Sequence, residues 1–219
     1  MTSRILVINP NSNERITQGI DQAMDSFRVA YGVDISCSTL ADGPFGIEID
    51  EDISAVVPLI VNEIGKHDDC DAFVIACYSD PGLDESRAAS SKPVFGIQES
   101  AVSLSATFER RFGVLALRRE SIQRHIAYIR QLGYQSFYAG ERPLDVSVEE
   151  AANDIRVLQK IIDIGRQLIE EDGAETLILG SAGLALHRQA AQLELGVPVI
   201  DPVQAAVKMA AESLGHQTA

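Results

Sequence analysis

The stretch Asp71-Ala-Phe-Val-Ile-Ala-Cys77 is a short apolar run that ends in a thiol, and the turn residues Asp80-Pro-Gly82 follow it closely. Roughly a hundred residues later the chain repeats this pattern as Glu175-Thr-Leu-Ile-Leu-Gly-Ser181, followed by Ala182 and Gly183. A short continuous apolar run bounded by turn residues is typical of a strand buried on both faces, as in a parallel sheet. The repeat therefore predicts two similar halves, each built around such a strand.

The segments that flank these two runs repeat as well. Lys92–Val102 matches Val197–Val207, and Arg4–Pro10 matches Arg111–Leu117, each at nearly the same offset. Along the chain, apolar runs of strand length alternate with segments of helical period, which is typical of βαβ units and parallel sheets. We therefore expect an α/β fold with two pseudo-symmetric, Rossmann-like lobes, each built on a parallel sheet of about four strands.

The repeat also predicts where the lobes divide. We expect residues 1–98 to form the first lobe and residues 99–202 the second, while the C-terminal helix at 203–219 either stays with the second lobe or crosses back to complete the first. The expected strands are 4–9, 33–40, 72–76, 94–97, 112–116, 136–138, 176–179 and 199–200. The longer expected helices are 50–67, 100–109, 121–132, 184–195, 202–214 and an interrupted one at 147–171.

Ligands bind beyond the carboxyl ends of the strands in open parallel sheets. Four segments with reactive or polar side chains come at such ends: Asn9-Pro-Asn11, Cys77-Tyr-Ser-Asp80, Ala116–Arg119 and Ser181-Ala-Gly183. We therefore expect an active site in the cleft between the lobes, with Cys77 and Ser181 on opposite walls. Two facing groups are what a reaction at both faces of one carbon requires.

Cys77 and Ser181 each have a functional and a structural interpretation. A thiol at a strand-to-helix junction lies near backbone N–H groups, which lower its pKa and suit a base or nucleophile. Free cysteine is also among the most buried residue types, but the repeat and the Gly/Pro turn favour a functional Cys77. Ser181 is nearly isosteric with cysteine and can exchange hydrogen bonds, yet a serine hydroxyl is a poor base without a partner. Its structural interpretation is a helix N-cap.

The candidates for substrate binding have weaker signals. The segment Asn9-Pro-Asn11 either holds a carboxylate or carbonyl oxygen or forms an Asx turn with a helix cap. An arginine after the strand 112–116 either binds a substrate carboxylate or is solvated. Asp80 is expected to cap a helix or to brace the Cys77 loop. Backbone N–H groups at these strand-to-helix junctions can bind an oxyanion. The full set is Asn9, Pro10, Asn11, Tyr78, Ser79, Asp80, Leu117, Arg118, Arg119, Ala182 and Gly183.

Composition disfavours several classes of partner. Lys and Arg total 18 against 32 Asp and Glu, and the net charge of −14 disfavours binding to nucleic acid or anionic membranes. We see no signal peptide and no apolar run long enough to span a membrane. The 3 Cys indicate neither a disulfide framework nor a thiolate zinc site, and they fit a cytoplasmic location.

Cofactor and metal signals are absent from the sequence. Neither a GxGxxG segment after a strand nor a Walker motif occurs, so we expect no nucleotide cofactor. The four histidines share no metal-ligand spacing, so we expect no metal site and interpret them as surface or helix residues. They are His67, His125, His187 and His216.

The chain resembles the aspartate/glutamate/hydantoin racemase superfamily, and most closely its hydantoin and allantoin racemase branch. The likeness spans the whole chain and rests on Asn9-Pro-Asn11, Asp71–Leu83, Pro93–Ile97, Leu179–Leu184 and Gly196–Val203. Its most specific element is Cys-x-x-Asp-Pro-Gly-Leu. The resemblance implies a cofactor-independent racemase or epimerase in which two cysteines, one per face, remove and return a proton on a carbon next to a carbonyl. It also implies a homo-oligomer, a small-molecule substrate such as a hydantoin-like cyclic ureide, and a first catalytic cysteine at Cys77.

The chain departs from this branch at three places. Ser181 stands where the branch has its second cysteine, Ala116–Arg119 stand where threonines are usual, and Gln98-Glu99 replaces a frequent Gly-Glu pair. Ser181 is either an engineered replacement of cysteine or the mark of a natural single-thiol member. The alternatives to a racemase are a single-thiol lyase, decarboxylase or cis-trans isomerase of the same superfamily, and a ligand-binding protein without catalysis.

Overall fold

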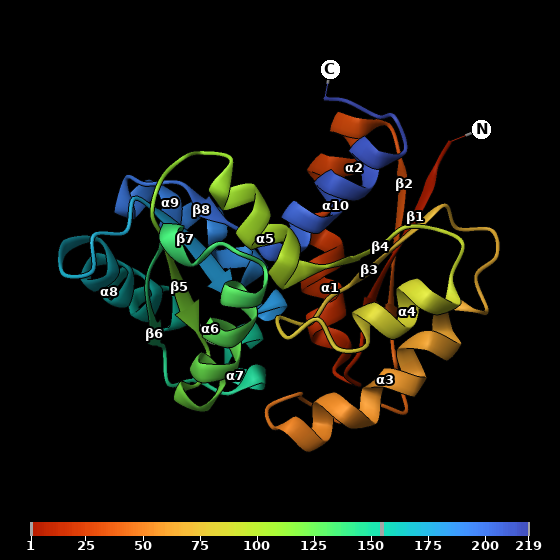
Figure 1. Ribbon diagram of the computed structural model, residues 1–219, viewed down its shortest axis with the longest axis horizontal. Helices are drawn as coiled ribbons and strands as arrows, with labels where there is room; N and C mark the ends of the chain where they lie inside the picture. Colours follow the sequence, from red (N-terminus) through yellow and green to blue (C-terminus); the bar gives the residue numbers. More distant parts are fainter. Residues whose placement is uncertain (1, 154–155, 219) are drawn as a thin grey trace.

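The computed structural model describes residues 2–153 and 156–218 and contains two four-stranded parallel sheets (Figure 1). The first has the strand order β2-β1-β3-β4 and the second β6-β5-β7-β8. The first sheet consists of β1 (Arg4–Asn9), β2 (Asp34–Thr39), β3 (Ala72–Ile75) and β4 (Val94–Gly96). The second consists of β5 (Phe112–Ala116), β6 (Tyr138–Pro143), β7 (Thr176–Gly180) and β8 (Val199–Ile200). The expected α/β fold with a parallel sheet in each half is confirmed.

The two sheets share one topology, as the sequence repeat predicts. In each half the first strand pairs with the second and third, and the third pairs with the fourth. The runs that end at Cys77 and Ser181 form β3 and β7, and all side chains of these strands are buried. Their carboxyl ends therefore occupy equivalent places in the two sheets.

Helices cover both sheets. The first half contains α1 (Glu14–Ala23), α2 (Asp25–Tyr31), α3 (Asp50–Ile64), α4 (Leu83–Ala89) and α5 (Ile97–Ala106). The second half contains α6 (Ile122–Gln131), α7 (Val148–Asn153), α8 (Arg156–Glu170), α9 (Arg188–Leu195) and α10 (Pro202–Ser213). Short 3-10 helices are η1 (Arg119–Ser121), η2 (Gln135–Phe137) and η3 (Ala182–His187).

The two halves share a core in addition to their own packing. One apolar cluster joins side chains of the first sheet, such as Val7, to Phe112 and Ile178 of the second. Buried Val203 and Ala206 of α10 belong to the same cluster, and Figure 1 shows α5 and α10 between the sheets. Each fully buried Val or Phe side chain contributes about 1.5–3 kcal/mol, so this shared cluster holds the sheets in a fixed relation.

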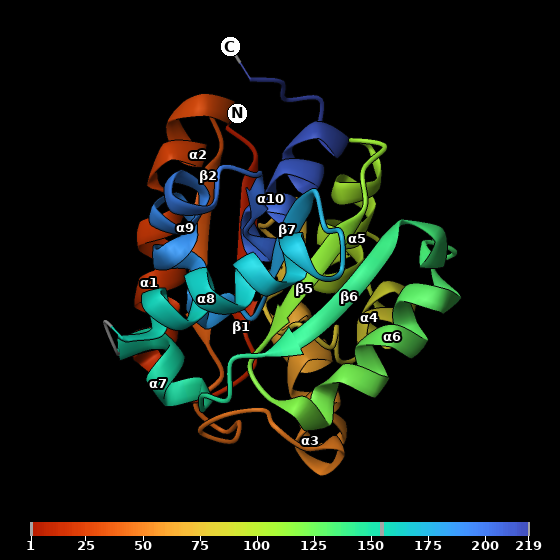
Figure 2. The same cartoon turned by 90° about the vertical axis from the view of Figure 1, so that its left-hand side faces the viewer.

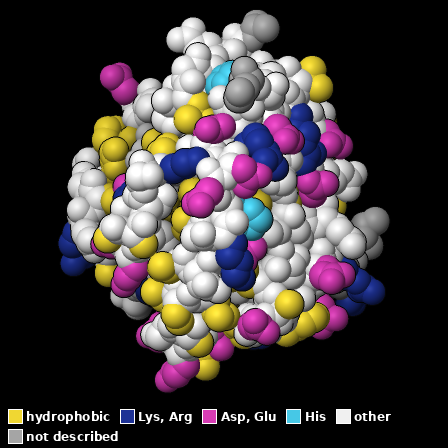
Figure 3. Space-filling view, turned by 90° about the vertical axis from the view of Figure 1, so that its right-hand side faces the viewer, with side chains coloured by type: hydrophobic (Ala, Val, Ile, Leu, Met, Phe, Trp, Pro, Cys, Tyr) yellow, Lys and Arg dark blue, Asp and Glu magenta, His cyan; other side chains and the backbone are white. Residues whose placement is uncertain are grey.

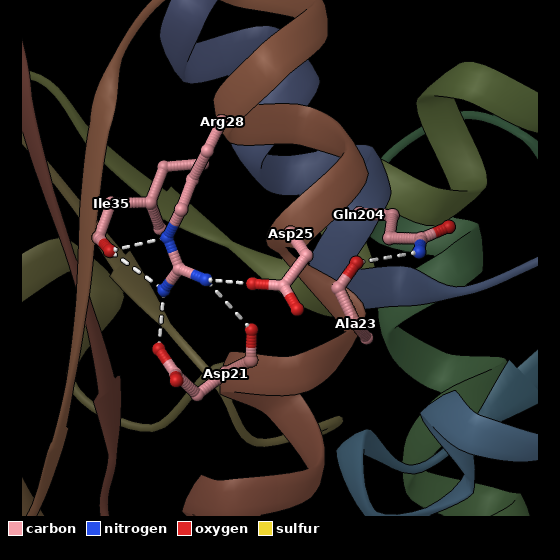
Figure 4. A network of polar contacts seen from close by, with 6 residues as sticks. All are labelled: Asp21, Ala23, Asp25, Arg28, Ile35 and Gln204. Carbon is pink, nitrogen blue, oxygen red and sulfur yellow. Dashed lines mark hydrogen bonds and ion pairs between the residues drawn. The ribbon is translucent and has the colours of Figure 1, made fainter.

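The C-terminal helix contacts both halves. Besides β7, α10 packs on α5, β3 and β4, and the Nε2 atom of Gln204 donates to the carbonyl of Ala23 at 3.1 Å (Figure 4). Beyond the helix, Nε2 of His216 lies 2.9 Å from Oγ of Ser3, so the segment after α10 contacts the residues before β1. The division at residue 98 stays a prediction, and that residue lies in the first turn of α5.

Arg28 fastens the helices of the first half to the sheet edge. Its guanidinium donates to the carbonyl of Ile35 in β2 from Nε at 3.0 Å and from Nη2 at 2.8 Å. It also pairs with the carboxylates of Asp21 and Asp25, as Figure 4 shows. These contacts position α1, whose first turn follows the Asn9–Asn13 segment.

Several element boundaries differ from the sequence predictions. The strand expected at 136–138 is instead β6 at Tyr138–Pro143, at the edge of the second sheet in Figure 2. Its glycine, its charged residues and Pro143 hide a strand pattern, and proline is tolerated at a sheet edge. The helix expected at 184–195 begins as the 3-10 helix η3 and becomes α9 only at Arg188. The predicted segment 147–171 contains α7 and α8, and the residues between these helices, 154–155, lie outside the described residues.

The surface shows mixed charge. In Figure 3 the Lys and Arg side chains of one face lie among Asp and Glu side chains, without a large basic patch. Within residues 2–153 and 156–218, no helix combines the length and the apolarity that a membrane crossing requires.

Candidate active site

A cleft of about 70 Å³ opens between the sheets, at the carboxyl ends of β3, β5 and β7. Both halves contribute to it, as the sequence predicts. The first half supplies Asn11, Ile16, Ile47, Glu48, Ala76, Cys77, Tyr78 and Ser79. The second half supplies Leu117, Arg118, Ser121, Arg124, His125, Val148, Gly180, Ser181, Ala182 and Gly183.

Cys77 lies two residues beyond the end of β3, and its side chain is partly buried. Burial raises the pKa of the Cys77 thiol to about 12. The backbone N–H of Ser79 lowers the pKa, the charge of Asp80 raises it and that of Arg124 lowers it. The predicted effect of a backbone N–H on the thiol pKa is therefore present. Desolvation outweighs it, because one N–H hydrogen bond stabilises the thiolate less than the water that burial removes. The thiol of the free protein is neutral and suited to donate a proton.

Ser181 follows β7 directly and combines its two predicted interpretations. Its Oγ accepts a hydrogen bond from the backbone N–H of Gly183 at 3.2 Å and caps η3. The same residue lines the cleft together with Cys77. A hydroxyl that accepts from the backbone keeps its own proton for donation, so Ser181 can donate a hydrogen bond to a substrate oxygen.

Asp80 braces the Cys77 loop and lies outside the cleft lining. Its buried carboxylate accepts from the backbone N–H of Gln98 at 2.9 Å and of Glu99 at 2.8 Å, in the first turn of α5. A Cβ atom at Gly96 would lie 2.3 Å from the Asp80 carboxyl carbon, so glycine is required there. The expected bracing role fits these contacts, whereas the inclusion of Asp80 among substrate-binding residues does not. Burial raises its pKa to about 7, against the two N–H groups that lower it.

The Asn9-Pro-Asn11 segment is folded by its own side chains. Nδ2 of Asn9 donates to Oδ1 of Asn11 at 3.0 Å and to Oγ1 of Thr17 at 3.0 Å. Oδ1 of Asn11 also accepts from the backbone N–H of Asn13 at 2.9 Å, which is an Asx-type turn. Of the three predicted residues, Asn11 lines the cleft, while Asn9 and Pro10 are not among its lining residues. The Asn11 amide nitrogen is therefore the donor that this segment offers to a substrate oxygen.

The predicted arginines have different positions. Arg118 lines the cleft, and its Nη2 lies 3.4 Å from Oε2 of Glu48, whereas Arg119 lies in η1 outside the lining. Arg124, which we did not predict, lies in the first turn of α6 and also lines the cleft. Its Nη1 pairs with Asp50 at 2.6 Å, while its buried Nε has no partner among the described residues. Cationic groups therefore reach the cleft from the second half.

The sequence analysis also missed His125, which we interpreted as a surface or helix residue. It lies in α6 but is buried, and its Nδ1 is 2.6 Å from Oε1 of Glu141 in β6. Its ring meets Tyr78 edge-on, with a centroid distance of 5.0 Å. Burial raises the pKa of the Glu141 carboxyl, and the hydrogen bond from His125 opposes this rise. The available signal was position, because His125 precedes buried Ile129 by one turn on the inner face of α6.

The sequence of this chain is similar to that of proteins of known function. The model of the family Asp/Glu/Hydantoin racemase matches residues 5–210. The chain belongs to this family. The hydantoin racemase of Rhizobium meliloti is 36% identical, over 96% of this chain and 88% of that protein. The hydantoin racemase of Paenarthrobacter aurescens is 33% identical, over 98% of this chain and 93% of that protein.

Solved structures agree with these sequence relatives. The structure of allantoin racemase from Klebsiella pneumoniae covers 100% of this chain, and the chain covers 91% of it, with a TM-score of 0.91 and 30% identity. The relatives support an isomerase, and specifically a racemase of the hydantoin and allantoin branch. The predicted resemblance is therefore confirmed at the level of the family and the branch.

One group of side chains outside the cleft has metal-ligating chemistry. The ligand atoms of His67, Asp69 and Cys70 lie within 4.8 Å of one another, just before β3. Asp69 already pairs with Arg4, and Nε2 of His67 lies 3.3 Å from Oε1 of Glu63. A cation there would have to displace the Arg4 guanidinium, and the group lies at the opposite strand end from the cleft.

Proposed function

We propose that this protein is a cofactor-independent racemase or epimerase that moves the α-proton of a hydantoin-like cyclic ureide or a related carbonyl compound. The observation that carries the proposal is the pairing of Cys77 and Ser181 at equivalent strand ends, in one cleft of a hydantoin and allantoin racemase relative. A carbon between these walls is accessible from both faces, which inversion requires.

The cleft offers donors for the charge that develops during proton removal. When the α-proton leaves, negative charge moves to the neighbouring carbonyl oxygen. The backbone N–H of Ser79, the amide of Asn11 and the hydroxyl of Ser181 belong to residues that line the cleft, and each can donate to such an oxygen. Cys77 serves as the proton donor on one face, because burial keeps its thiol neutral.

A single-thiol enzyme is the second candidate function. Cys77 is the one thiol among the described residues that line the cleft, and the Oγ of Ser181 is engaged as a cap. A neutral thiol could protonate an enolate formed by decarboxylation or elimination, which needs a proton donor on one face only. The products separate the candidates, since inversion leaves the composition of the substrate unchanged.

The test is proton exchange at the α-carbon in deuterated water, with both enantiomers of a 5-substituted hydantoin and with a panel of amino acids. We expect deuterium to enter at the α-position together with loss of optical activity. The same assay is run on Ser181→Cys, which restores the thiol that relatives of this branch are expected to have. No exchange in either protein would reject the racemase proposal, and a decarboxylated or unsaturated product would favour the second candidate.

A further inference from the structure

The proton donor of the cleft needs a base as its counterpart. Inversion requires one group that removes the α-proton from one face and another that delivers a proton to the opposite face. The described titratable side chains of the lining, besides Cys77, are Glu48, Tyr78, Arg118, Arg124 and His125.

Three of these groups are unsuited to accept a proton. Arginine keeps its proton in proteins, which removes Arg118 and Arg124 from consideration. Burial holds the pKa of Tyr78 well above its usual value, so the phenol does not become a base near neutral pH.

Glu48 is occupied by contacts with the second half. Its Oε2 lies 3.4 Å from Nη2 of Arg118, and its Oε1 accepts from the backbone N–H of Val148 at 3.4 Å. Both carboxylate oxygens of Glu48 therefore contact residues of the second half. His125 is the remaining group.

His125 has the arrangement of an imidazole base. Its Nδ1 is 2.6 Å from Oε1 of Glu141, so a carboxylate that accepts the Nδ1 proton leaves the Nε2 lone pair for another partner. Among the described residues, the ring makes its hydrogen bond through Nδ1 to Glu141, and His125 lines the cleft. The ring cannot swing freely, because Tyr78 packs edge-on against it at a centroid distance of 5.0 Å.

Glu141 strengthens this base. The Glu141 side chain has no solvent exposure, and its Oε2 is buried with no hydrogen-bond partner among the described residues. A buried carboxylate with a single hydrogen-bond partner is stabilised more strongly by a cationic partner than by a neutral one, because the cation compensates its negative charge. A proton on Nε2 would convert this hydrogen bond into an ion pair between Nδ1 and Oε1, which lie 2.6 Å apart.

We propose that His125, held by Glu141, is the second proton-transfer group of the cleft and works against Cys77 on the opposite face of the substrate carbon. Nε2 takes the α-proton, and the electron pair of the broken C–H bond moves into the enolate. The Cys77 thiol then gives its proton to the other face of that carbon, and the enolate pair forms the new C–H bond. This leaves an imidazolium and a thiolate, which is the state that runs the reaction in the reverse direction.

This inference rests on the proposed racemase function and names the base that Ser181 cannot supply. It assigns Ser181 a hydrogen-bonding role instead. It also explains how a chain with one thiol in the described part of its cleft can act on both faces of a carbon.

The first test separates the two faces of the substrate. Each enantiomer of a 5-substituted hydantoin is incubated in deuterated water with the wild type, Cys77→Ala and Cys77→Ala/His125→Gln. In Cys77→Ala we expect inversion to fall about 10²–10⁴-fold, while one enantiomer keeps exchanging its α-proton without inversion. The double variant should lose that exchange. Exchange that persists in the double variant, or that is equal for both enantiomers in Cys77→Ala, would overturn the proposal.

Single variants separate proton transfer from packing. His125→Gln should lower kcat about 10²–10⁴-fold while KM changes little, and Glu141→Gln should lower kcat less. Glu141→Gln should also leave KM little changed, because the amide keeps the side-chain volume and removes only the carboxylate charge. The matched control is His187→Gln, a partly buried histidine in η3 outside the lining. A His125→Gln variant with wild-type kcat would contradict the proposal.

A binding measurement keeps the inference testable if turnover is absent. In protein labelled with ¹⁵N-histidine, a 5-substituted hydantoin should shift the Nε2 resonance of His125 and leave that of His187 in place. Melting curves report whether each variant folds. If the wild type neither exchanges nor inverts the substrate, the proposed function fails. An unshifted His125 resonance with bound hydantoin would overturn the role of His125 alone.

Discussion

The carboxylate of Asp80 accepts the backbone N–H of Gln98 at 2.9 Å, and this bond joins the loop that carries Cys77 to the first turn of α5. Asp80 is buried and has a positive φ of 44°, so the loop geometry depends on this anchor. The thiol is therefore held by a carboxylate that titrates near neutral pH, since burial raises its pKa to about 7.

We expect Asp80 to make stability depend on pH. Its folded pKa of about 7 lies above the ordinary value of 3.8, so the folded state binds more protons than the unfolded state between these limits. Stability from this group is therefore greatest below about pH 4 and falls as pH rises toward 7, by on the order of a few kcal/mol. Urea unfolding of the wild type and Asp80→Asn at several pH values measures this.

A second buried carboxyl group, that of Asp201, contributes to the same pH dependence of stability. Burial also raises the pKa of Asp201 to about 6, which gives a slope of the same sign between pH 4 and 6. The difference between wild type and Asp80→Asn isolates Asp80, because Asp201 is common to both. A wild type and variant with parallel pH curves would show that Asp80 is not perturbed.

We expect Cys77 to react slowly with iodoacetamide at pH 7. Burial raises its pKa to about 12, so the thiolate fraction is small and grows about tenfold per pH unit through the neutral range. The rate is best measured in Cys37→Ser/Cys70→Ser, where Cys77 is the sole thiol. A rate that reaches a plateau between pH 6 and 8 would mean that the N–H groups, rather than desolvation, dominate.

Ser181→Ala should lower the free energy of unfolding and kcat only slightly. The loss of the η3 cap should lower the free energy of unfolding by about 0.5–2 kcal/mol. The loss of one hydrogen bond to a substrate oxygen should cost about 1 kcal/mol, or less than about tenfold in kcat. Steady-state kinetics and urea unfolding measure the two effects. A loss of kcat comparable to that of Cys77→Ala would instead place Ser181 in proton transfer.

Arg118 and Arg119 form a matched pair for substrate charge. Arg118→Ala should raise KM for a hydantoin whose side chain carries a carboxylate, because a charge-assisted pair contributes roughly 1.5–3 kcal/mol. Arg119→Ala is the control, since Arg119 lies outside the cleft lining. The exposed contact of Arg118 with Glu48 should change stability by no more than about 1 kcal/mol. Equal KM values for both variants would assign the site to neutral ureides.

Most of the fold could be predicted from the sequence because each buried strand is a continuous apolar run. The two runs that end at Cys77 and Ser181 predicted two sheets and a cleft between them, and the structure brings both residues to one cleft. Asn11 could be placed for the same reason, since it follows β1. The carboxyl ends of parallel strands lie at the same edge of a sheet, so the local sequence pattern is sufficient to place these residues at the cleft.

The remaining parts of the site depend on contacts between distant segments. His125 became visible only with its partner Glu141, which lies in β6, an edge strand whose polar sequence hides it. The pKa of Cys77 depends on how the two halves bury the thiol, which a local turn motif does not report. Asp80 could be assigned to bracing or to substrate, and its bonds to α5 favour bracing.

The central claim is that this cleft moves a proton on the carbon next to a carbonyl, with inversion. The most direct measurement follows one enantiomer of a 5-substituted hydantoin in deuterated water by ¹H NMR and chiral chromatography together. We expect the α-proton signal to disappear while the opposite enantiomer accumulates, and Cys77→Ala to slow that accumulation about 10²–10⁴-fold. Exchange and inversion that continue unchanged in Cys77→Ala would contradict the claim.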